Sequence, residues 1–403
     1  MMSEQRLVPE LRFPDFSESW DSVKLGEITN ITAGGTPRTT IAEFWGGNIP
    51  WMNSGELNLK KVKDVENRIT QKGLNNSSTK LIPEKCILIG LAGQGKTRAT
   101  AAINLISLCT NQSIAAVFPN EEYFDPLFLF QNIDSRYNEI RNMSTGQSGR
   151  GSLNLKIIKS IKVKLPSIQE QQKIASFLSA VDQRIALLEK KKELLEQYKK
   201  GVMQKIFSQE VRFKDEHGNE FPDWEYLKAN DLFRNHSNKD HNGELPILSA
   251  SQEHGMIFRE DSGIRIQSSE SSVKSYKIVE KNDFVISLRS FQGGIDFSSI
   301  TGICSPAYIV LKNKKPIDYH FYKHFFKKES FIHRLSNTVV GIRDGKQITY
   351  DNFSSLKIPY PSMIEQMNIS SFIDSIEELR ERLEHKLDLS KKFKKGLLQK
   401  MFV

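Results

Sequence analysis

The sequence predicts an α+β fold in which two β-rich mixed domains are separated by two long helices that form an antiparallel coiled coil. The first observation is a duplication. The stretches that begin at Pro166 and Pro361 align without a gap at an offset of 195 positions, and about 17 of the 42 paired residues are identical. The second is helical periodicity in both copies. The third is that the segments before the two copies share one plan, so the chain carries a pseudo-two-fold internal repeat.

Both copies have the composition of a long helix. Neither contains a proline after its start, and both are rich in Leu, Glu, Lys and Gln, which lose little side-chain freedom in a helix. Apolar residues recur at alternating spacings of four and three, and Lys192 and Lys199 fill two gaps in the first copy. A helix of roughly 40 residues is on the order of 60 Å long.

This spacing places the apolar residues along one side of the helix, where they pack against another helix, and the simplest partner is the other copy. The alternative is that two unrelated amphipathic helices each lie on a separate core, but the ungapped repeat argues against it. The predicted seam comprises Ile174, Leu178, Val181, Ile185, Leu188 and Leu195 in the first copy and Ile369, Ile373, Ile376, Leu383 and Leu387 in the second.

The duplication divides the chain into a first domain at 1–165, a first helix at 166–208, a second domain at 209–360 and a second helix at 361–403. Each domain combines short β-rich runs, broken by Gly, Pro and Asn, with one helix, near 126–143 in the first and 319–335 in the second. Strands do not alternate with helices, which argues against a parallel doubly wound sheet. Both domains open on a Phe-Pro-Asp sequence followed by a Trp and by a Lys four residues later.

Composition narrows the class of protein. The chain has 403 residues, 38% of them hydrophobic, and a formal charge of +9 with a pI near 9.2, which suits a polyanionic partner. The three cysteines are scattered and form no metal-binding framework. No apolar run approaches the roughly 20 residues needed to span a bilayer. We therefore expect a cytoplasmic protein without a membrane association.

Three stretches resemble the DNA specificity subunit of type I restriction–modification enzymes. They are ITAGGTPRTTIAEFWGGNIPWMNSGEL at 31–57, LPSIQEQQKIASFL at the first helix start, and its counterpart PSMIEQMNISSFI at the second. The resemblance covers nearly the whole chain. The second domain departs from it, because LPILSAS replaces the IPWMNSG element and the Gly-Gly-Thr-Pro is missing.

The resemblance implies two target recognition domains held apart by antiparallel helices. It also implies a bipartite, asymmetric site on double-stranded DNA, and binding to two modification subunits that carry the adenine methyltransferase site and to ATP-dependent restriction subunits. On this reading the chain binds no cofactor, and S-adenosylmethionine, ATP and Mg²⁺ belong to the partner subunits.

Polar, glycine-containing loops supply the candidate DNA contacts. Arg can grip guanine and Gln can grip adenine in a bidentate manner, whereas Lys and Ser mostly hold phosphates. The alternative for each loop is a solvated turn. The candidates are Arg38, Thr39, Lys96, Arg98, Gln147, Ser148 and Arg150 in the first domain, and Arg289, Ser290, Gln292, Arg343 and Lys346 in the second.

One motif suggests a different function. Gly90 to Thr97 satisfies the G-x-x-x-x-G-K-[ST] pattern of a phosphate-binding loop and follows an apolar run. The second domain has no counterpart, and the surroundings lack alternating strands and helices. A phosphate-loop ATPase with a coiled-coil insert is thus the enzyme alternative, and a coiled-coil scaffold that does not bind DNA is the structural alternative.

Residues for catalysis or metal binding are lacking. The methyltransferase motif Asn/Asp-Pro-Pro-aromatic does not follow the Gly-rich stretches, and the eight histidines do not pair at a convincing metal-ligand spacing. His320 and His324 alone make a weak case. We predict a non-catalytic subunit without a resident metal.

Overall fold

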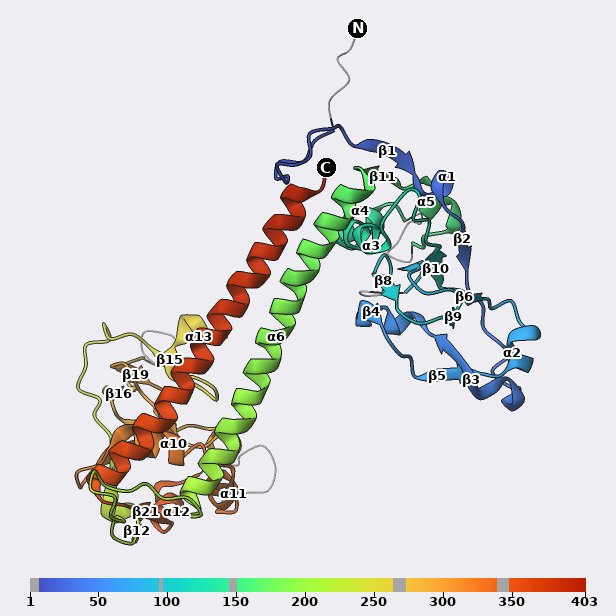
Figure 1. Ribbon diagram of the computed structural model, residues 1–403. Helices are drawn as coiled ribbons and strands as arrows, with labels where there is room; N and C mark the ends of the chain where they lie inside the picture. The colour runs from blue at the N-terminus through green and yellow to red at the C-terminus, as the bar shows by residue number, and fades with distance from the viewer. Residues whose placement is uncertain (1–6, 94–96, 145–150, 264–272, 339–347) are drawn as a thin grey trace. The chain divides into compact units, whose positions relative to one another are not determined.

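A computed structural model describes residues 7–93, 97–144, 151–263, 273–338 and 348–403. The chain divides into two compact units, and Figure 1 shows the helices and strands of both. Unit 1 comprises Met1–Glu189 and Lys386–Val403, and unit 2 comprises Lys190–His385. Each unit therefore contains one predicted domain and a part of each long helix, so the helices do not form a unit of their own.

The described residues of unit 1 form three sheets, with strand orders β1-β11, β2-β10-β7-β8-β4 and β5-β3-β9-β6. The pairings of β3 with β9 and of β4 with β8 are parallel, and the other pairings between these strands are antiparallel. The strands are β1 (Asp21–Lys24), β2 (Ile31–Ala33), β3 (Trp45–Met52), β4 (Lys61–Val62), β5 (Asn67–Ile69), β6 (Leu81–Ile82), β7 (Ile87–Gly90), β8 (Ala101–Asn104), β9 (Leu108–Thr110), β10 (Ile114–Val117) and β11 (Lys162–Leu165).

Short helices cover the sheets of unit 1. Asp125 caps the longest of them by accepting hydrogen bonds from the amides of Leu127 and Phe128, and Pro126 occupies its first turn, where a missing N–H costs nothing. The helices are α1 (Leu25–Ile28), α2 (Gln71–Asn75), α3 (Pro126–Ser135), α4 (Tyr137–Asn142) and α5 (Leu155–Ser160), with 3₁₀ turns at Ala42–Phe44 and Ser54–Leu59.

Unit 2 repeats this plan with smaller sheets, in the orders β12-β21, β13-β20-β17-β18, β14-β15 and β16-β19. Its strands are β12 (Glu225–Lys228), β13 (Phe233–His236), β14 (Leu248–Ser251), β15 (Gly255–Phe258), β16 (Lys277–Val279), β17 (Phe284–Ile286), β18 (Asp296–Phe297), β19 (Gly302–Cys304), β20 (Ile309–Asn313) and β21 (Lys357–Tyr360). Its short helices are α7 (Ala229–Leu232), α9 (Ser290–Gly293), α10 (Tyr319–Phe325), α11 (Glu329–Ser336) and α12 (Tyr350–Ser354), with a 3₁₀ turn at Arg259–Ser262.

The one helix predicted in each domain is two helices in the structure. In unit 1 the break falls at Arg136, whose φ of −95° and ψ of 20° leave the helical region while its guanidinium donates to the carbonyl oxygen of Lys162. In unit 2 the break lies between α10 and α11. The predictions near 126–143 and 319–335 were right about helical content and wrong about continuity.

The two long helices are α6 (Ile168–Phe207) and α13 (Met363–Met401), drawn in green and red in Figure 1. Within unit 1, Asp182 of α6 pairs with Lys394 of α13 at 2.6 Å, and Glu189 pairs with Lys391 at 2.6 Å. Residue numbers rise along one helix while they fall along the other, so the pairing is antiparallel.

Unit 2 shows the same direction. Lys192 Nζ lies 2.8 Å from a carboxylate oxygen of Glu384, and Lys199 Nζ lies 2.5 Å from Glu377. The antiparallel pairing that the sequence predicted is therefore confirmed in each unit. Among the described residues, no helix is both long and apolar enough to cross a lipid bilayer.

The two domain starts share a Phe-Pro-Asp sequence, a Trp and a Lys. In the structure the Trp and Lys residues occupy equivalent places in the two units, but the two Phe-Pro-Asp sequences do not. Trp20 and Trp224 are both buried, and each precedes the strand that pairs with the last strand of its domain. However, Phe13 packs edge-on against Phe177, and the same contact in unit 2 joins Phe372 to Phe213, not to the Phe of the second Phe-Pro-Asp. A turn between Lys214 and Glu220 displaces that motif. The true counterparts are Glu-Leu-Arg-Phe at 10–13 and Glu-Val-Arg-Phe at 210–213.

Candidate functional site

The repeated Glu-Gln at the start of each long helix fixes that helix to its domain. Gln171 accepts a hydrogen bond from the amide of Asp125 at 2.9 Å and donates to the carbonyl oxygen of Pro166 at 2.9 Å. Gln366 does the same with the amide of Asp318 at 2.9 Å and the carbonyl oxygen of Pro361 at 2.8 Å. An amide side chain can accept one hydrogen bond and donate another at the same time, which an ionised carboxylate cannot do, and this accounts for a glutamine at this position.

The glutamate before each glutamine is buried and paired with an arginine. Glu170 receives two parallel hydrogen bonds, each 2.7 Å long, from the guanidinium of Arg12. Glu365 is paired with Arg212 at 3.2 Å. Side-chain hydrogen bonding to Glu170, working against desolvation, raises the pKa of Arg12. These arginines were not among the residues predicted from the sequence. The signal was present, because both occupy the third position of a repeated sequence, Glu-Leu-Arg-Phe in one half and Glu-Val-Arg-Phe in the other.

The predicted helix seam is buried to different degrees along its length. Its interrupting lysines, Lys192 and Lys199, reach glutamates of the other helix, so ion pairs alternate with apolar contacts. Ile174, Leu178, Ile369 and Ile373 are buried among domain residues as well as residues of the other helix, Ile376 and Leu383 are also buried, and Val181, Ile185, Leu188, Leu195 and Leu387 are partly buried.

The glycine-rich motif of the first domain presents an exposed turn. A Cβ added at Gly34 would lie 2.1 Å from the carbonyl oxygen of Thr110, and one added at Gly35 would lie 2.3 Å from Ser78 Oγ, so neither position accepts a side chain. Trp51 Nε1 donates to the carbonyl oxygen of Gly35 at 3.0 Å. The turn that follows carries the predicted contacts Arg38 and Thr39, and both side chains are exposed.

In the second domain, Arg289 lies in the turn after β17 and Gln292 lies in the single-turn helix α9 that follows, and both are exposed. Neither side chain forms a hydrogen bond or an ion pair with another described residue. Ser290 differs from the prediction. It is 1% exposed, and its hydroxyl accepts a hydrogen bond from the amide of Ser287 at 2.8 Å, so it shapes the turn and is not available to DNA.

Arg98 was also predicted as a DNA contact, but its side chain is turned into the domain. It is 8% exposed, and its guanidinium donates to the carbonyl oxygen of Gly151, so it joins two segments of the domain. Six further predicted contacts lie outside the described residues: Lys96, Gln147, Ser148, Arg150, Arg343 and Lys346.

The phosphate-loop pattern has the wrong context. Such a loop must end at a helix N-terminus, where backbone amides meet the phosphates. Here β7 pairs antiparallel with β8, and the amide of Ala99 donates to the carbonyl oxygen of Gly90 at 2.9 Å. The described residues on either side of the pattern therefore form a strand, a turn and a second strand, which argues against a nucleotide site.

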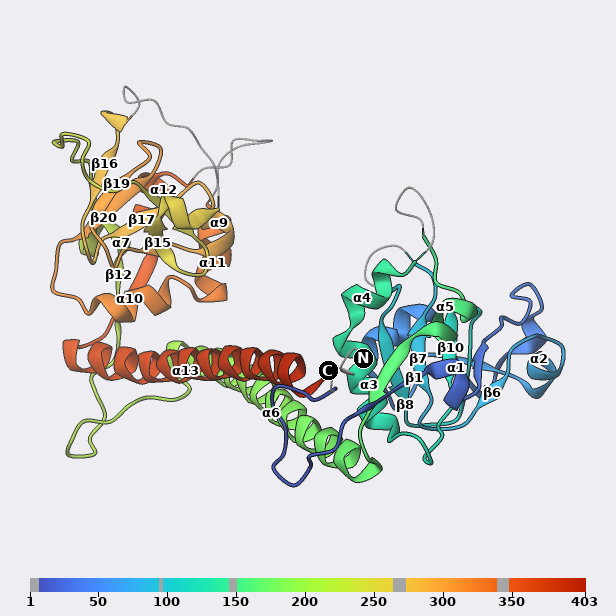
Figure 2. The same ribbon diagram turned by 90° about the horizontal axis from the view of Figure 1, so that it is seen from above.

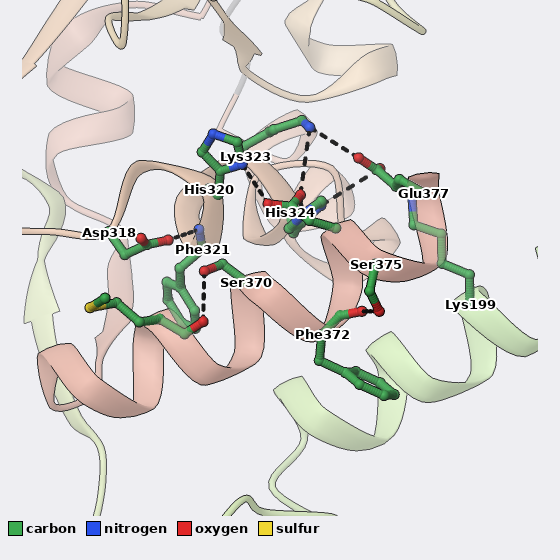
Figure 3. Close-up of polar contacts among 12 residues, drawn as sticks. Lys199, Asp318, His320, Phe321, Lys323, His324, Ser370, Phe372, Ser375 and Glu377 are labelled. Atoms are coloured by element: carbon green, nitrogen blue, oxygen red, sulfur yellow. Dashed lines mark hydrogen bonds and ion pairs between the residues drawn. The ribbon is translucent and has the colours of Figure 1, made fainter. Parts of the chain in front are cut away.

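Unit 2 holds an ionisable cluster where α10 packs on α13, as Figures 2 and 3 show. His320 Nδ1 lies 2.6 Å from Asp374 Oδ2, and His324 Nε2 lies 2.8 Å from Asp374 Oδ1. Lys199 and Lys323 contact Glu377 at 2.5 and 3.0 Å. The pairing of His324 with Asp374 replaces a neutral pair in unit 1, where Gln131 Nε2 lies 3.2 Å from Ser179 Oγ.

Ligand-type atoms of His324, Asp374 and Glu377 lie within 4.8 Å of one another. The two carboxylates are already matched by the ammonium groups of Lys199 and Lys323, so a divalent cation would add uncompensated positive charge. We therefore assign the cluster a structural role.

The pKa shifts in this cluster have clear causes. Burial alone would raise the pKa of Asp374, but hydrogen bonds and charge from His324 and His320 lower it to about 2. Burial would likewise raise the pKa of Glu377, and the nearby His324, Lys199 and Lys323 lower it to about 2. Burial lowers the pKa of His324, while its hydrogen bond with Asp374 and the charge of Glu377 work in the opposite direction.

We expect acid to loosen α10 from α13. A carboxylate with a lowered folded pKa contributes stability above its ordinary value, 3.8 for Asp374, and that stability is lost as the pH falls toward about 2. His324 acts in the same direction, because protonation of the unfolded state below pH 6.5 favours unfolding. The contribution of Asp374 is about 2 kcal/mol.

Hydrogen exchange of α10 between pH 7 and pH 2, corrected for intrinsic rates, measures this effect. The α3 helix of unit 1, which packs through Gln131 and Ser179, is the internal control. The double variant His324→Gln, Asp374→Ser copies that neutral pair and should remove most of the pH dependence. Equal acid sensitivity of α3 and α10 would contradict the assignment.

The chain also matches known proteins. A family model described as the type I restriction modification DNA specificity domain matches residues 17–197 and 223–389, which together cover more than half of the chain. The chain belongs to this DNA specificity family. Each match spans one domain and most of the long helix that follows it, so the repeat of the specificity subunit is a domain plus a helix.

Similar specificity subunits support the assignment. The subunit of the type I restriction enzyme MjaVIII from Methanocaldococcus jannaschii is 26% identical over 411 residues, covering 96% of this chain and 92% of that one. The MjaIX subunit of the same organism is 29% identical over 235 residues, and this match spans 54% of this chain and 52% of the relative.

The fold agrees as well. The crystal structure of a type I system S subunit from M. genitalium matches with a TM-score of 0.58 at 15% identity, over 98% of this chain and 99% of that chain. The predicted fold class is thus confirmed. The family assignment makes the chain a DNA-recognition subunit and not an enzyme, which confirms the functional class that the sequence predicted.

Proposed function

We propose that this specificity subunit reads a bipartite, asymmetric site on double-stranded DNA and positions two modification subunits over adenines in the two half-sites. Its restriction subunits join the same complex. The observation that supports this most is the pair of repeats, which share a helix junction but expose different turns. One turn carries Arg38 and Thr39, and the other carries Arg289 and Gln292. Two domains with different exposed turns recognise two different half-sites.

The partner subunits supply the chemistry in this proposal. S-adenosylmethionine belongs to the modification subunits, and ATP and Mg²⁺ belong to the restriction subunits. The specificity subunit contributes geometry and acts on DNA in the cytoplasm. Mapping methylated adenines in cells that express this chain with its modification subunit tests the proposal. A single continuous motif, or methylation that does not depend on this chain, would contradict it.

The two exposed arginines should affect different half-sites. Loss of one bidentate contact to a base costs about 1–3 kcal/mol of discrimination. Arg38→Ala is therefore expected to relax one base position in one half-site, and Arg289→Ala one position in the other. Methylome sequencing of both variants measures this directly.

Thr39→Ala and Gln292→Ala are companion variants, each of which changes a residue close to one of the two exposed arginines. Arg98→Lys is the contrasting variant, because the buried Arg98 contacts a backbone carbonyl. It should change stability and leave the recognised sequence intact. If Arg38→Ala and Arg289→Ala relaxed the same half-site, the assignment of one half-site to each domain would be wrong.

A further inference from the structure

A buried ion pair of unit 2 lies beside α9, the helical turn that carries Gln292 and directly follows Arg289. Asp296 of β18 is 3% exposed, and its Oδ1 lies 2.7 Å from Nζ of Lys327, which follows α10. The turn also packs against α11, next to which α9 lies in Figure 2. The pair thus lies between the residues proposed to contact DNA and the helical part of the domain.

Lys327 uses all of its hydrogen-bond donors within the domain. Besides Asp296, its ammonium donates to the carbonyl oxygen of Gly293 at 2.9 Å and to that of Gln252 at 3.3 Å. An ammonium has three N–H groups, so these three acceptors satisfy it. Gly293 ends α9, and Gln252 lies in the turn between β14 and β15. One side chain therefore connects α9, β18 and the β14–β15 hairpin.

The second carboxylate oxygen of Asp296 extends this network to the backbone of Arg289. Asp296 Oδ2 accepts a hydrogen bond from the hydroxyl of Ser287 at 3.1 Å, and Ser287 Oγ lies 3.3 Å from Ser290 Oγ. Ser287 Oγ also accepts a hydrogen bond from the amide of Arg289 at 3.4 Å. Both serines are buried. An unbroken chain of contacts thus runs from Lys327 to the backbone that carries the Arg289 side chain.

Close backbone packing fixes the end of the same turn. Gly294 follows α9 with a φ of +77°, and a Cβ added there would lie 2.1 Å from the carbonyl oxygen of Phe326. A Cβ added at Gly293 would lie 2.8 Å from Cγ of Gln252 and would displace that side chain. The turn therefore packs on the residue that precedes Lys327, which fixes its placement relative to α10.

The ion pair is costly to bury. Burial raises the pKa of Asp296, while the charge of Lys327 and hydrogen bonds from Lys327 and Ser287 act in the opposite direction. An ion pair taken out of water adds little net stability compared with apolar side chains of the same volume. What it fixes is the position of the groups that it joins, because each acceptor must stay within hydrogen-bonding distance of Nζ.

Unit 1 carries a pair of the opposite polarity at the equivalent helix position. Asp134 corresponds to Lys327 at an offset of 193 positions, and it pairs with Lys60 at 2.6 Å. Both side chains of that pair are more exposed than those of the pair in unit 2. The fold therefore does not require a buried aspartate and lysine here, and the buried pair belongs to the turn of the second domain.

We infer that Asp296 and Lys327 are positioning residues for DNA recognition, which hold the turn 287–294 so that Arg289 and Gln292 meet the bases in one register. The inference rests on the proposed function, in which these two exposed side chains contact one half-site. Asp296 is buried and the ammonium of Lys327 is fully occupied, so both act through the turn. A bidentate contact needs its side chain held within about 0.5 Å of the productive place, which a turn tied at several points provides.

Asp296→Asn tests this inference, because it keeps the shape of the side chain and removes its charge. The full chain in complex with its modification subunit is titrated, by fluorescence anisotropy, with the duplex identified by methylome mapping and with duplexes in which one base pair is replaced. The ratio of the two dissociation constants should fall about 10-fold at the base pair that Arg289→Ala relaxes. The ratios in the other half-site should not change.

A double-mutant cycle separates positioning from a general loss of stability. If Asp296 acts through Arg289, adding Asp296→Asn to Arg289→Ala should change the ratio at that base pair no further. Ser287→Ala leaves the ion pair in place and should lower the same ratio about threefold, so it tests the network even if Asp296→Asn does not fold. Circular dichroism and hydrogen exchange of α10 check that each variant is folded.

Glu280→Gln is the matched control, because it breaks another ion pair of the same domain. Glu280 lies 2.7 Å from Nζ of Lys312, at the opposite end of β17 from the turn, where Phe284 pairs with Leu311. All the ratios should stay unchanged in this variant.

A folded Asp296→Asn complex with unchanged ratios, or with equal losses in both half-sites, would overturn the inference, and so would additive effects in the cycle. In each case a bipartite methylome that depends on Arg289 would leave the proposed function standing. If Arg289→Ala relaxed neither half-site, the proposed role of this turn in recognition would be wrong, and the inference would fall with it.

Discussion

Arg12→Ala is expected to destabilise unit 1 by about 3–5 kcal/mol, because it leaves a buried carboxylate without its partner. Glu170 is 1% exposed and receives both of its short hydrogen bonds from Arg12. Urea unfolding followed by hydrogen exchange should show the loss in α3 and in the first turns of α6.

Unit 2 is the internal control for this variant, since Glu365 keeps its own pair with Arg212. The double variant Arg12→Met, Glu170→Gln removes both charges and should recover most of the stability, because no uncompensated charge remains. If Arg12→Ala alone were as stable as the unchanged chain, the ion pair could not be what anchors α6.

Matching insertions in the two long helices are expected to change which DNA is methylated. Seven residues inserted after Glu189 in α6 and seven after His385 in α13 lengthen both helices by about 10 Å and preserve the seam, because seven residues are close to two turns. At about 3.4 Å per base pair the spacer should grow by about three base pairs while both half-sites stay the same. Methylome sequencing gives the result directly.

A control insertion in α6 alone should reduce methylation instead. It lengthens α6 without lengthening α13, so the ion pairs before the insertion (Asp182 with Lys394) and after it (Lys192 with Glu384) cannot all form at the same time. Changed half-sites in the doubly extended chain would show that helix length does not set the spacer. A spacer of unchanged length would lead to the same conclusion.

The helices and their direction could be predicted from the sequence because periodicity is a local signal and the repeat supplies the partner. The lysines of the seam looked like interruptions, since a single-sequence pattern does not show which acidic side chain stands opposite. The role of Gln171 was equally hidden. Its two hydrogen bonds join the helix start to the domain, and the amide it bonds belongs to Asp125, 46 positions earlier.

The candidate DNA contacts were harder to predict, because exposure depends on neighbours that are distant in sequence. Arg98 and Arg38 look alike as residues after a glycine-rich loop, yet only Arg98 meets the carbonyl oxygen of Gly151 and is buried. Ser290 is likewise buried, because its hydroxyl accepts a hydrogen bond from the amide of Ser287 in the same turn. The start of the second domain was misaligned because Phe-Pro-Asp is a longer match than Arg-Phe, although the Arg and Phe make the contacts.

The discontinuity of unit 1 has a consequence for how the chain is made. Unit 2 is continuous from Lys190 to His385, so all of its contacts exist once that stretch has left the ribosome. Unit 1 also needs Lys386–Val403, where Leu397 and Met401 join a core that otherwise comes from the first 181 residues. Of the two units, the one whose synthesis begins earlier is therefore completed later, and until then the apolar residues at the start of α6 lack part of their cover.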